Sequence, residues 1–303
     1  MTTKRKVLLG LGLYFLITAL LIVIVGSEGK NESFQPQNEF RLEPWIELTI
    51  AGIDFSITKA VFYLVLASAA TIGAMVFIAN RMQREPNKVQ MAVELAYDLT
   101  RENITKGNIP DAALARRWFP YLAGLFFFIW FSNMLGYLPL PTNTEHKVDI
   151  FGLEVPTLAI YAATANISIP LVLALVSTAA YHIEGIRTKG PIKYFASWLP
   201  AGLEDMNIFG KAAIFSIEAI SHLVRPISLS VRLFANILAG HLLILFMAGG
   251  LAVLLGLAAL GTLTFPMAFA FFVFEIGLVA TLQAFIFSTL TAIYIGGATA
   301  ESH

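Results

Sequence analysis

Cysteine is absent from the 303-residue sequence, and charged residues are scarce. Without cysteine there is no disulfide framework, no thiol nucleophile and no Cys-ligated metal site. Only 13% of the residues are charged and 57% are hydrophobic, whereas about 25% of the residues in soluble domains are charged. The composition is therefore that of a polytopic membrane protein.

Features that would indicate several other functions are missing as well. The formal net charge is zero and there is no basic patch, so we expect no nucleic-acid partner. There is no glycine-rich phosphate loop, so we expect no bound nucleotide. We also expect no cofactor and no metal ion.

Apolar runs of about 20 residues, the length that crosses a bilayer, recur along the chain. They are Ala60–Ala79, Phe119–Leu138, Leu158–Tyr181 and Phe265–Ile295. The loops 80–118 and 183–211 are rich in Lys and Arg, which favours the cytoplasmic side, whereas the acidic loop 142–155 favours the outside. Within the first basic loop, Pro86 can open an amphipathic helix over residues 87–103.

The N-terminal region, residues 1–26, holds three basic residues followed by the apolar run Val7–Val25. A cleaved signal peptide and a retained span are both open. The length of the run favours a retained span with a cytoplasmic N-terminus. Residues 27–59 are acidic and are expected outside the cytoplasm on the membrane surface. Residues 60–303 are expected to form a single membrane domain.

The stretch Ala212–Leu260 is too long for one upright span. As a straight helix it would measure about 73 Å, against a hydrocarbon core of about 30 Å. Two upright spans and one tilted, bent helix both fit this length. Pro226 would supply the bend.

Ionisable residues are rare after Ala212, so each one can be considered singly. Of the 20 Lys and Arg residues only Arg225 and Arg232 lie there, and of the 20 acids only Glu218, Glu275 and Glu301. A guanidinium stays protonated and is costly to place in hydrocarbon. Arg232 is therefore expected to face a carboxylate or water and to carry the function.

Helical periodicity groups these residues. Glu218, Arg225 and Arg232 are seven apart and fall near one stripe, with Asn236 one turn further on the same side. The small residues that follow Asn236 would let another helix approach closely. His241 is nine residues from Arg232 and should face elsewhere.

This arrangement suits proton movement past a fixed cation. A permanent cation stabilises a neighbouring carboxylate as its anion. A carboxylate on a moving partner that passes Arg232 must therefore release its proton on one side and regain one on the other. Glu218 and the pair of His241 and Glu275 could serve separate aqueous paths.

Two segments carry a specific family resemblance. The run SLSVRLFANILAGHLL, together with LQAFIFSTLTAIY near the end, resembles subunit a of F-type ATP synthases. The similarity extends from about Trp45 to Ile295. Such a subunit is the non-catalytic membrane stator beside a rotating ring of c subunits, and it couples proton flow across the membrane to ring rotation and ATP synthesis.

The resemblance implies roles for individual residues. Arg232 matches the essential arginine that attracts the ring carboxylate and blocks proton leakage, with Asn236 and Gln283 as its polar neighbours. Glu218 matches the acid of the cytoplasmic half-channel. His241 and Glu275 resemble the pair that lines the opposite half-channel, although Glu275 lies eight residues before Gln283 instead of the expected seven.

The resemblance also implies a fold and an assembly. We expect an all-α integral membrane protein with about five core transmembrane helices, including a long, tilted C-terminal pair, plus the extra helix Val7–Val25. Ala212–Leu260 is then one tilted helix. Expected partners are the ring of c subunits, b-type peripheral stalk subunits, the F1 sector indirectly and membrane lipid. The expected location is the plasma (inner) membrane of a bacterium, with a cytoplasmic C-terminus and H⁺ or Na⁺ as the ion.

Two other classes fit the composition. A secondary transporter could bind an anionic substrate at Arg232, but such proteins often contain paired repeats and here the polar cluster is confined to one half of the chain. A structural scaffold is disfavoured by ionisable residues placed inside a membrane segment.

Overall fold

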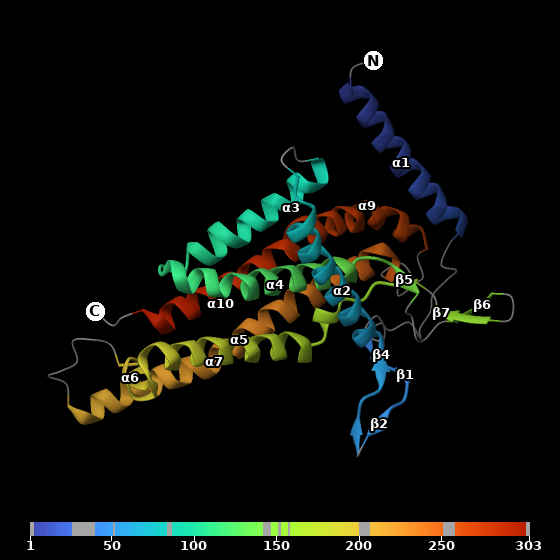
Figure 1. Cartoon of the computed structure of the whole chain (residues 1–303). Coiled ribbons are helices and arrows are strands. Elements are labelled where there is room, and N and C mark those ends of the chain that lie inside the picture. The colour runs from blue at the N-terminus through green and yellow to red at the C-terminus, as the bar shows by residue number, and fades with distance from the viewer. Residues whose placement is uncertain are drawn as a thin grey trace. The chain divides into compact units, whose positions relative to one another are not determined.

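The computed structural model describes residues 3–25, 40–50, 52–83, 87–141, 147–150, 153–156, 158–199, 207–250 and 258–300. The helices in this part of the chain are α1 (Thr3–Val25), α2 (Lys59–Arg81), α3 (Lys88–Asp98), α4 (Ala112–Gly136), α5 (Ser168–Lys189), α6 (Pro191–Ala196), α7 (Ile208–Leu245), α9 (Ala258–Phe274) and α10 (Ala280–Thr299) (Figure 1). The segments η2 (Leu99–Lys106), η4 (Phe246–Gly250) and η5 (Glu275–Val279) are π-helical, and η3 (Ala163–Ala165) is a 3₁₀ turn.

Five helical stretches of the described chain are long and apolar enough to cross a membrane: Lys59–Asn80, Ala112–Gly136, Ser168–Lys189, Ile208–Ala248 and Thr264–Thr299. The chain is therefore an all-α integral membrane protein that crosses the membrane several times, as predicted. The helix α1 matches the predicted run Val7–Val25. It is not one of these five stretches, so its crossing of the membrane stays a prediction.

Ile208–Leu245 is a single α-helix of 38 residues and continues directly into η4. Of the two arrangements considered for this stretch, two upright spans are therefore wrong, and one long helix is correct. Its α-helical part is about 57 Å long, nearly twice the hydrocarbon thickness. Pro226 lies inside the helix without ending it. Residues 251–257 lie outside the described part of the chain.

Two predicted boundaries are wrong for physical reasons. α4 begins at Ala112 instead of Phe119, because Arg116 and Arg117 belong to the helix and not to the loop. α5 covers Ser168–Lys189 instead of Leu158–Tyr181. Its proline, Pro170, sits in the first turn, where the missing N–H is not needed.

The polar segments are mostly irregular, with short antiparallel ladders that hydropathy does not predict. In residues 40–59, β1 (Pro44–Ile46) pairs with β4 (Ile57–Thr58), and β2 (Thr49–Ile50) pairs with β3 (Ile53–Asp54). After α4, β5 (Leu140–Pro141) pairs with β8 (Leu158–Ala159), and β6 (Lys147–Ile150) pairs with β7 (Leu153–Pro156). Residues 26–39 of the predicted acidic segment lie outside the described part. The predicted divisions near residues 26 and 59 stay predictions.

Close packing divides the chain into two compact units. The first comprises Met1–Lys59, Gly136–Tyr161 and Ile237–Val279, and the second comprises Ala60–Leu135, Ala162–Asn236 and Ala280–His303. In the first unit α9 packs against α1 and η4. In the second unit α10 packs against α5 and η2.

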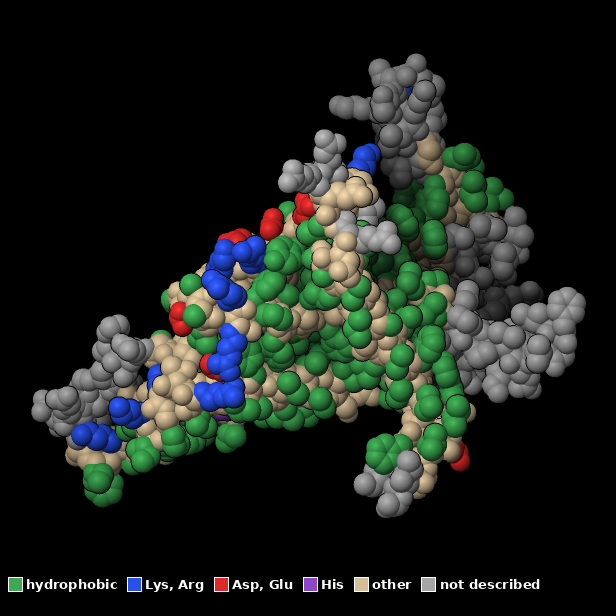
Figure 2. Space-filling view, viewed as in Figure 1, with side chains coloured by type: hydrophobic (Ala, Val, Ile, Leu, Met, Phe, Trp, Pro, Cys, Tyr) green, Lys and Arg blue, Asp and Glu red, His purple; other side chains and the backbone are tan. Residues whose placement is uncertain are grey.

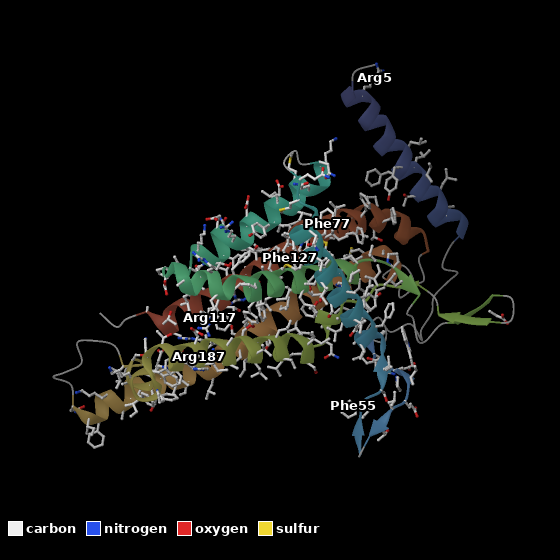
Figure 3. All side chains as sticks on the ribbon, in the orientation of Figure 1. Arg5, Phe55, Phe77, Arg117, Phe127 and Arg187 are labelled. Atoms are coloured by element: carbon white, nitrogen blue, oxygen red, sulfur yellow. The ribbon has the colours of Figure 1, made fainter. Side chains whose placement is uncertain are left out.

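The second unit has a well-packed interior with one basic side. Its most buried large side chains include Leu122, Ile129, Tyr181, Tyr194, Leu233 and Phe287. Figure 2 shows Lys and Arg side chains along one side of this unit and hydrophobic side chains over much of the rest of its visible face. Arg117 and Arg187 are labelled near that side in Figure 3. The amphipathic helix predicted over residues 87–103 is present as α3 and the start of η2, with Asn87 as its N-cap.

Candidate functional site

In the second unit, Glu218 and Arg225 form an ion pair along α7. The Arg225 Nη2–H donates to Glu218 Oε1 at 2.9 Å. The two residues are seven apart, which is about two helical turns, so their side chains lie on one stripe as the periodicity predicted. Both side chains are about one-third exposed or less. The acid therefore has a cation within hydrogen-bond reach at the half-buried surface of the helix.

His222 completes this cluster from the intervening turn. Its Nδ1 lies 3.3 Å from Arg225 Nη1, and a guanidinium can only donate. Nδ1 must therefore accept, which leaves the proton of a neutral ring on Nε2. Nε2 in turn lies 3.7 Å from Glu218 Oε1. The geometry thus favours a neutral His222 that faces the carboxylate with its N–H.

Aromatic rings hold His222 in this orientation. The ring stacks on Trp198 with centroids 4.3 Å apart and an interplanar angle of 20°. The Tyr181 hydroxyl lies 3.1 Å from His222 Nδ1, and Arg225 lies over the Tyr294 ring at 5.2 Å. Four segments of the second unit therefore contribute to the environment of one acid–base cluster.

A second histidine, His182, lies next to the first. Its ring centroid is 5.1 Å from that of His222, and its Nδ1 is 2.7 Å from the Tyr194 hydroxyl. Burial raises the pKa of Tyr194 above its ordinary value, so the phenol stays protonated and can donate to Nδ1.

A cavity of about 520 Å³ opens at this cluster. Its lining includes Glu218, His222, Arg225, Tyr294, Lys189 and Ser197. A space of this size with polar walls can hold several water molecules. Water could therefore reach the carboxylate of Glu218 in the middle of an otherwise apolar helix.

Arg232 and Asn236 lie further along α7, and both are exposed. Apolar residues of the same helix, including Ile227 and Val231, are exposed as well. Within the part of the chain that the structure describes, no carboxylate lies within ion-pairing distance of the Arg232 guanidinium. The described part of the chain thus presents a permanent cation on an apolar surface and supplies no carboxylate that neutralises it.

Gln283 is placed differently from Asn236. It is 5% exposed and lies in α10 beside the buried Ala280 and Ala284. Asn133 of α4 donates to the carbonyl oxygen of Ala280 at 3.3 Å. Among the described residues, no hydrogen bond joins Gln283 to Arg232, and the predicted neighbourhood of these two residues stays a prediction.

In the first unit, His241 is 3% exposed and lies between two backbone carbonyls. Its Nδ1 is 2.9 Å from the oxygen of Ile237, and its Nε2 is 3.0 Å from the oxygen of Gly136. A neutral imidazole has one donor nitrogen, so it can make only one of these hydrogen bonds. The two carbonyls therefore hold the imidazole between them, whichever of its nitrogens carries the proton.

Glu275 is 7% exposed in the same unit, and Tyr137 connects it with His241. The Tyr137 hydroxyl donates to Glu275 Oε2 at 3.0 Å, while its ring centroid is 4.4 Å from that of His241. Burial raises the pKa of the Tyr137 phenol, and the Glu275 carboxylate raises it further. The hydroxyl is therefore a donor at physiological pH.

Gly240 allows this close approach. A Cβ added at this glycine would collide with the carboxylate of Glu275. Gly240 is one of the small residues after Asn236 that were expected to let another helix approach. In the structure the space beside it holds the carboxylate of Glu275. Sequence reasoning missed Tyr137, because nothing in the sequence connects a residue directly after one span with an acid 138 positions later.

The π-helical segment η5 explains the spacing of Glu275. η5 covers Glu275–Val279 and follows α9 without a break. A π-turn holds one residue more than an α-turn. Eight residues from Glu275 to Gln283 therefore correspond to about the same number of turns as seven in a regular α-helix.

Known proteins are similar in sequence to this chain over most of its length. The family model described as ATP synthase A chain matches residues 61–296. ATP synthase subunit a of Rubrobacter xylanophilus is 36% identical over 254 residues, which cover 84% of this chain and 88% of the relative. ATP synthase subunit a of Agrobacterium fabrum is 31% identical, with coverage of 88% and 98%. The same subunit of Rhodospirillum rubrum is 31% identical, with coverage of 87% and 97%.

The family match, the relatives and the arrangement of apolar helices agree with the resemblance carried by the segment around Arg232. The chain belongs to the ATP synthase A chain family, that of ATP synthase subunit a.

Proposed function

We propose that this chain is the proton-translocating stator subunit of a rotary F-type ATP synthase in the inner membrane of a bacterium. It catalyses no reaction alone. Two half-channels would carry protons to and from a carboxylate on the ring of c subunits, and Arg232 would stand between them. The observation that carries this proposal is the exposure of Arg232 on an apolar stretch of α7 with no carboxylate of the described chain to neutralise it.

The charge of Arg232 accounts for the coupling. An exposed guanidinium facing a low-dielectric partner attracts a carboxylate in its anionic form and disfavours the protonated form. A ring carboxylate would therefore lose its proton on approaching Arg232 and regain one after leaving it. The same cation repels protons, so ions could not pass directly from one half-channel to the other. Asn236, one turn away and also exposed, would contribute a polar contact.

Each half-channel would use one of the two clusters. The cavity at Glu218, with Arg225 and His222, suits exchange with the cytoplasm because the basic segments lie toward that end of the helices. His241 and Glu275 would exchange protons with the opposite side. Gln283, buried in α10, would be a polar neighbour of Arg232, as Asn236 would.

The remaining parts of the assembly follow from this role. The ring of c subunits would contact the exposed stripe of α7, and b-type stalk subunits would hold the chain stationary against the F1 sector. The C-terminus would be cytoplasmic, and so would the N-terminus if α1 is retained as a span. The ion that we propose is H⁺. Selection of Na⁺ in its place would be made by the ring carboxylate, which lies on another chain.

Arg232→Ala in the assembled complex tests the proposal. Inverted membrane vesicles carrying the complex are supplied with ATP, and acidification of the lumen is followed with a pH-sensitive dye. We expect ATP-driven acidification to fall to background while the subunits still co-purify. Because Arg232 has no described ion pair, its removal should leave stability within about 0.5 kcal/mol.

Arg101→Ala is the matched control. Arg101 is an exposed arginine of η2, 3.7 Å from Glu102, and its removal should leave pumping unchanged. Coupled acidification that survives Arg232→Ala in a fully assembled complex would refute the proposal.

A further inference from the structure

Tyr137 occupies a position that packing alone does not require. Its side chain is fully buried, and a buried hydroxyl is destabilising unless it has a hydrogen-bond partner. Phenylalanine would fill the same volume against the edge of Phe272, whose ring centroid is 6.1 Å away. The hydroxyl therefore needs an explanation, and its hydrogen-bond partner is the carboxylate of Glu275.

Two contacts fix the Glu275 carboxylate. Tyr137 donates to Oε2 at 3.0 Å, and both carboxylate oxygens lie against Gly240, where a Cβ would collide with them. A hydrogen bond to a charged acceptor is stronger than one between neutral groups. The carboxylate is thus held against the backbone of α7, at the residue next to His241.

The ring of Tyr137 acts on His241 as well. It lies 4.4 Å from the imidazole at an interplanar angle of 31°, and the carbonyl oxygen of the preceding residue, Gly136, is 3.0 Å from His241 Nε2. The dipeptide Gly136-Tyr137 at the end of α4 therefore touches both groups. The Phe40 ring meets His241 in a T-shaped arrangement, with centroids 6.5 Å apart and an interplanar angle of 76°, and it carries no titratable group.

We propose that Tyr137 is a positioning residue of the proton path through Glu275 and His241: its hydroxyl orients the carboxylate and its ring orients the imidazole. This inference rests on the function proposed above. A proton would bind the Glu275 oxygen that Tyr137 does not occupy and leave from the same oxygen. The O–H bond of Tyr137 stays intact throughout, so no charge is left on the phenol.

Tyr137→Phe removes only the hydroxyl and keeps the ring. We expect the rate of ATP-driven acidification to fall about tenfold, the loss typical of one hydrogen bond to a charged group. The carboxylate anion loses its donor, so protonation becomes easier. The acid limb of the pH–rate profile should therefore move to higher pH. The titratable groups that face Tyr137 among the described residues are Glu275 and His241, and both remain in this variant.

Tyr121→Phe is the matched control. It deletes another tyrosine hydroxyl, that of a partly buried side chain, which lies 3.0 Å from the non-ionisable Ser177 Oγ. Its pH–rate profile should coincide with that of the unmodified complex, even if stability falls slightly. Tyr137→Leu, which removes the ring as well, should lower the rate further than Tyr137→Phe.

The outcomes separate this inference from the proposed function. If Arg232→Ala abolishes coupled pumping and Tyr137→Phe leaves rate and pH profile unchanged, only the role of Tyr137 is overturned. A lower rate for Tyr137→Phe with an unmoved pH–rate profile, like the profile expected for Tyr121→Phe, would also overturn the role of Tyr137. Such a result would show that the hydroxyl contributes only to structure. A lower rate together with the expected shift supports the role.

Discussion

Arg225 pairs with Glu218 at 2.9 Å, two turns away on the same helix. The guanidinium and the carboxylate are both partly exposed, and a cavity of about 520 Å³ lies beside them. From the sequence alone, Arg225 could equally be an arginine whose side chain extends to the membrane surface without an acidic partner. The ion pair instead makes it part of the environment of the acid assigned to the cytoplasmic half-channel, and the effect of replacing it can be predicted.

Arg225→Gln should slow proton translocation more than it destabilises the protein. A partly exposed ion pair is worth about 0–1 kcal/mol, so assembly and thermal midpoint should change little. The cation 2.9 Å from the Glu218 carboxylate is lost, however, and with it the contact that orients this acid beside the cavity. We expect ATP-driven acidification to fall several-fold, and Arg225→Lys to retain most of the rate. Lys193→Gln, which removes a basic residue of α6, is the control; a rate for Arg225→Gln equal to that of the control would contradict the prediction.

Gly240→Ala should damage the site of Glu275. The added Cβ would overlap the carboxylate, and overpacking of this kind costs about 1–3 kcal/mol. We expect a lower thermal midpoint of the complex and a large loss of proton pumping. Gly124→Ala in α4 is the control, because its Cβ would meet nothing within 4 Å. Alanine is the better helix former by about 1 kcal/mol, so that variant should be as stable as the parent or more so. Equal behaviour of the two variants would show that Glu275 does not lie against Gly240.

Hydropathy predicted the membrane spans because bilayer thickness sets their length, and helical periodicity predicted that Glu218 and Arg225 share a stripe. Span ends were less predictable. α4 extends through Arg116 and Arg117 because arginine is a good helix former although it is not apolar, and Glu184 of α5 pairs with Arg117 at 3.2 Å. That partner is 67 residues away in the sequence, and no local pattern indicates it.

The site was predictable to different degrees for the same reason. Arg232 was predicted as a site residue from the cost of a guanidinium in an apolar segment, which is a property of one residue. Tyr137 could not be predicted, because its proposed role depends on Glu275 and His241, which approach it only in the folded chain. The predicted contact of Gln283 with the Arg232 region depended on family resemblance, and among the described residues no hydrogen bond joins the two.

Arg117→Ala should destabilise the second unit. The Glu184 side chain is only 3% exposed, while that of Arg117 is 52% exposed. Removing the arginine leaves a buried carboxylate without its partner, and since one member of the pair is solvated we expect a loss of about 1–3 kcal/mol. The thermal midpoint of the purified complex would report it. Adding Glu184→Gln in the same chain should recover part of the loss, and an additive double variant would argue against coupling between the two residues.

Deletion of Gly277 should be tolerated, although deletion of a single residue from a membrane helix normally is not. Removing one residue from a regular α-helix rotates everything beyond it by about 100°. Gly277 lies inside η5, which holds one residue more than an α-turn. Its deletion should convert the π-turn into a regular turn and keep the buried face of α10 in place.

The same deletion would leave Glu275 seven residues before Gln283, the spacing that family resemblance led us to expect. We therefore expect the shortened chain to assemble and to retain measurable ATP-driven acidification. Deletion of Ile286 in the regular part of α10 is the control, and it should abolish assembly, because the buried residues Phe287, Ser288 and Thr291 would turn away from the interior. If both deletions were equally damaging, the π-turn would not be the site at which the extra residue is accommodated, and the spacing of Glu275 would require another explanation.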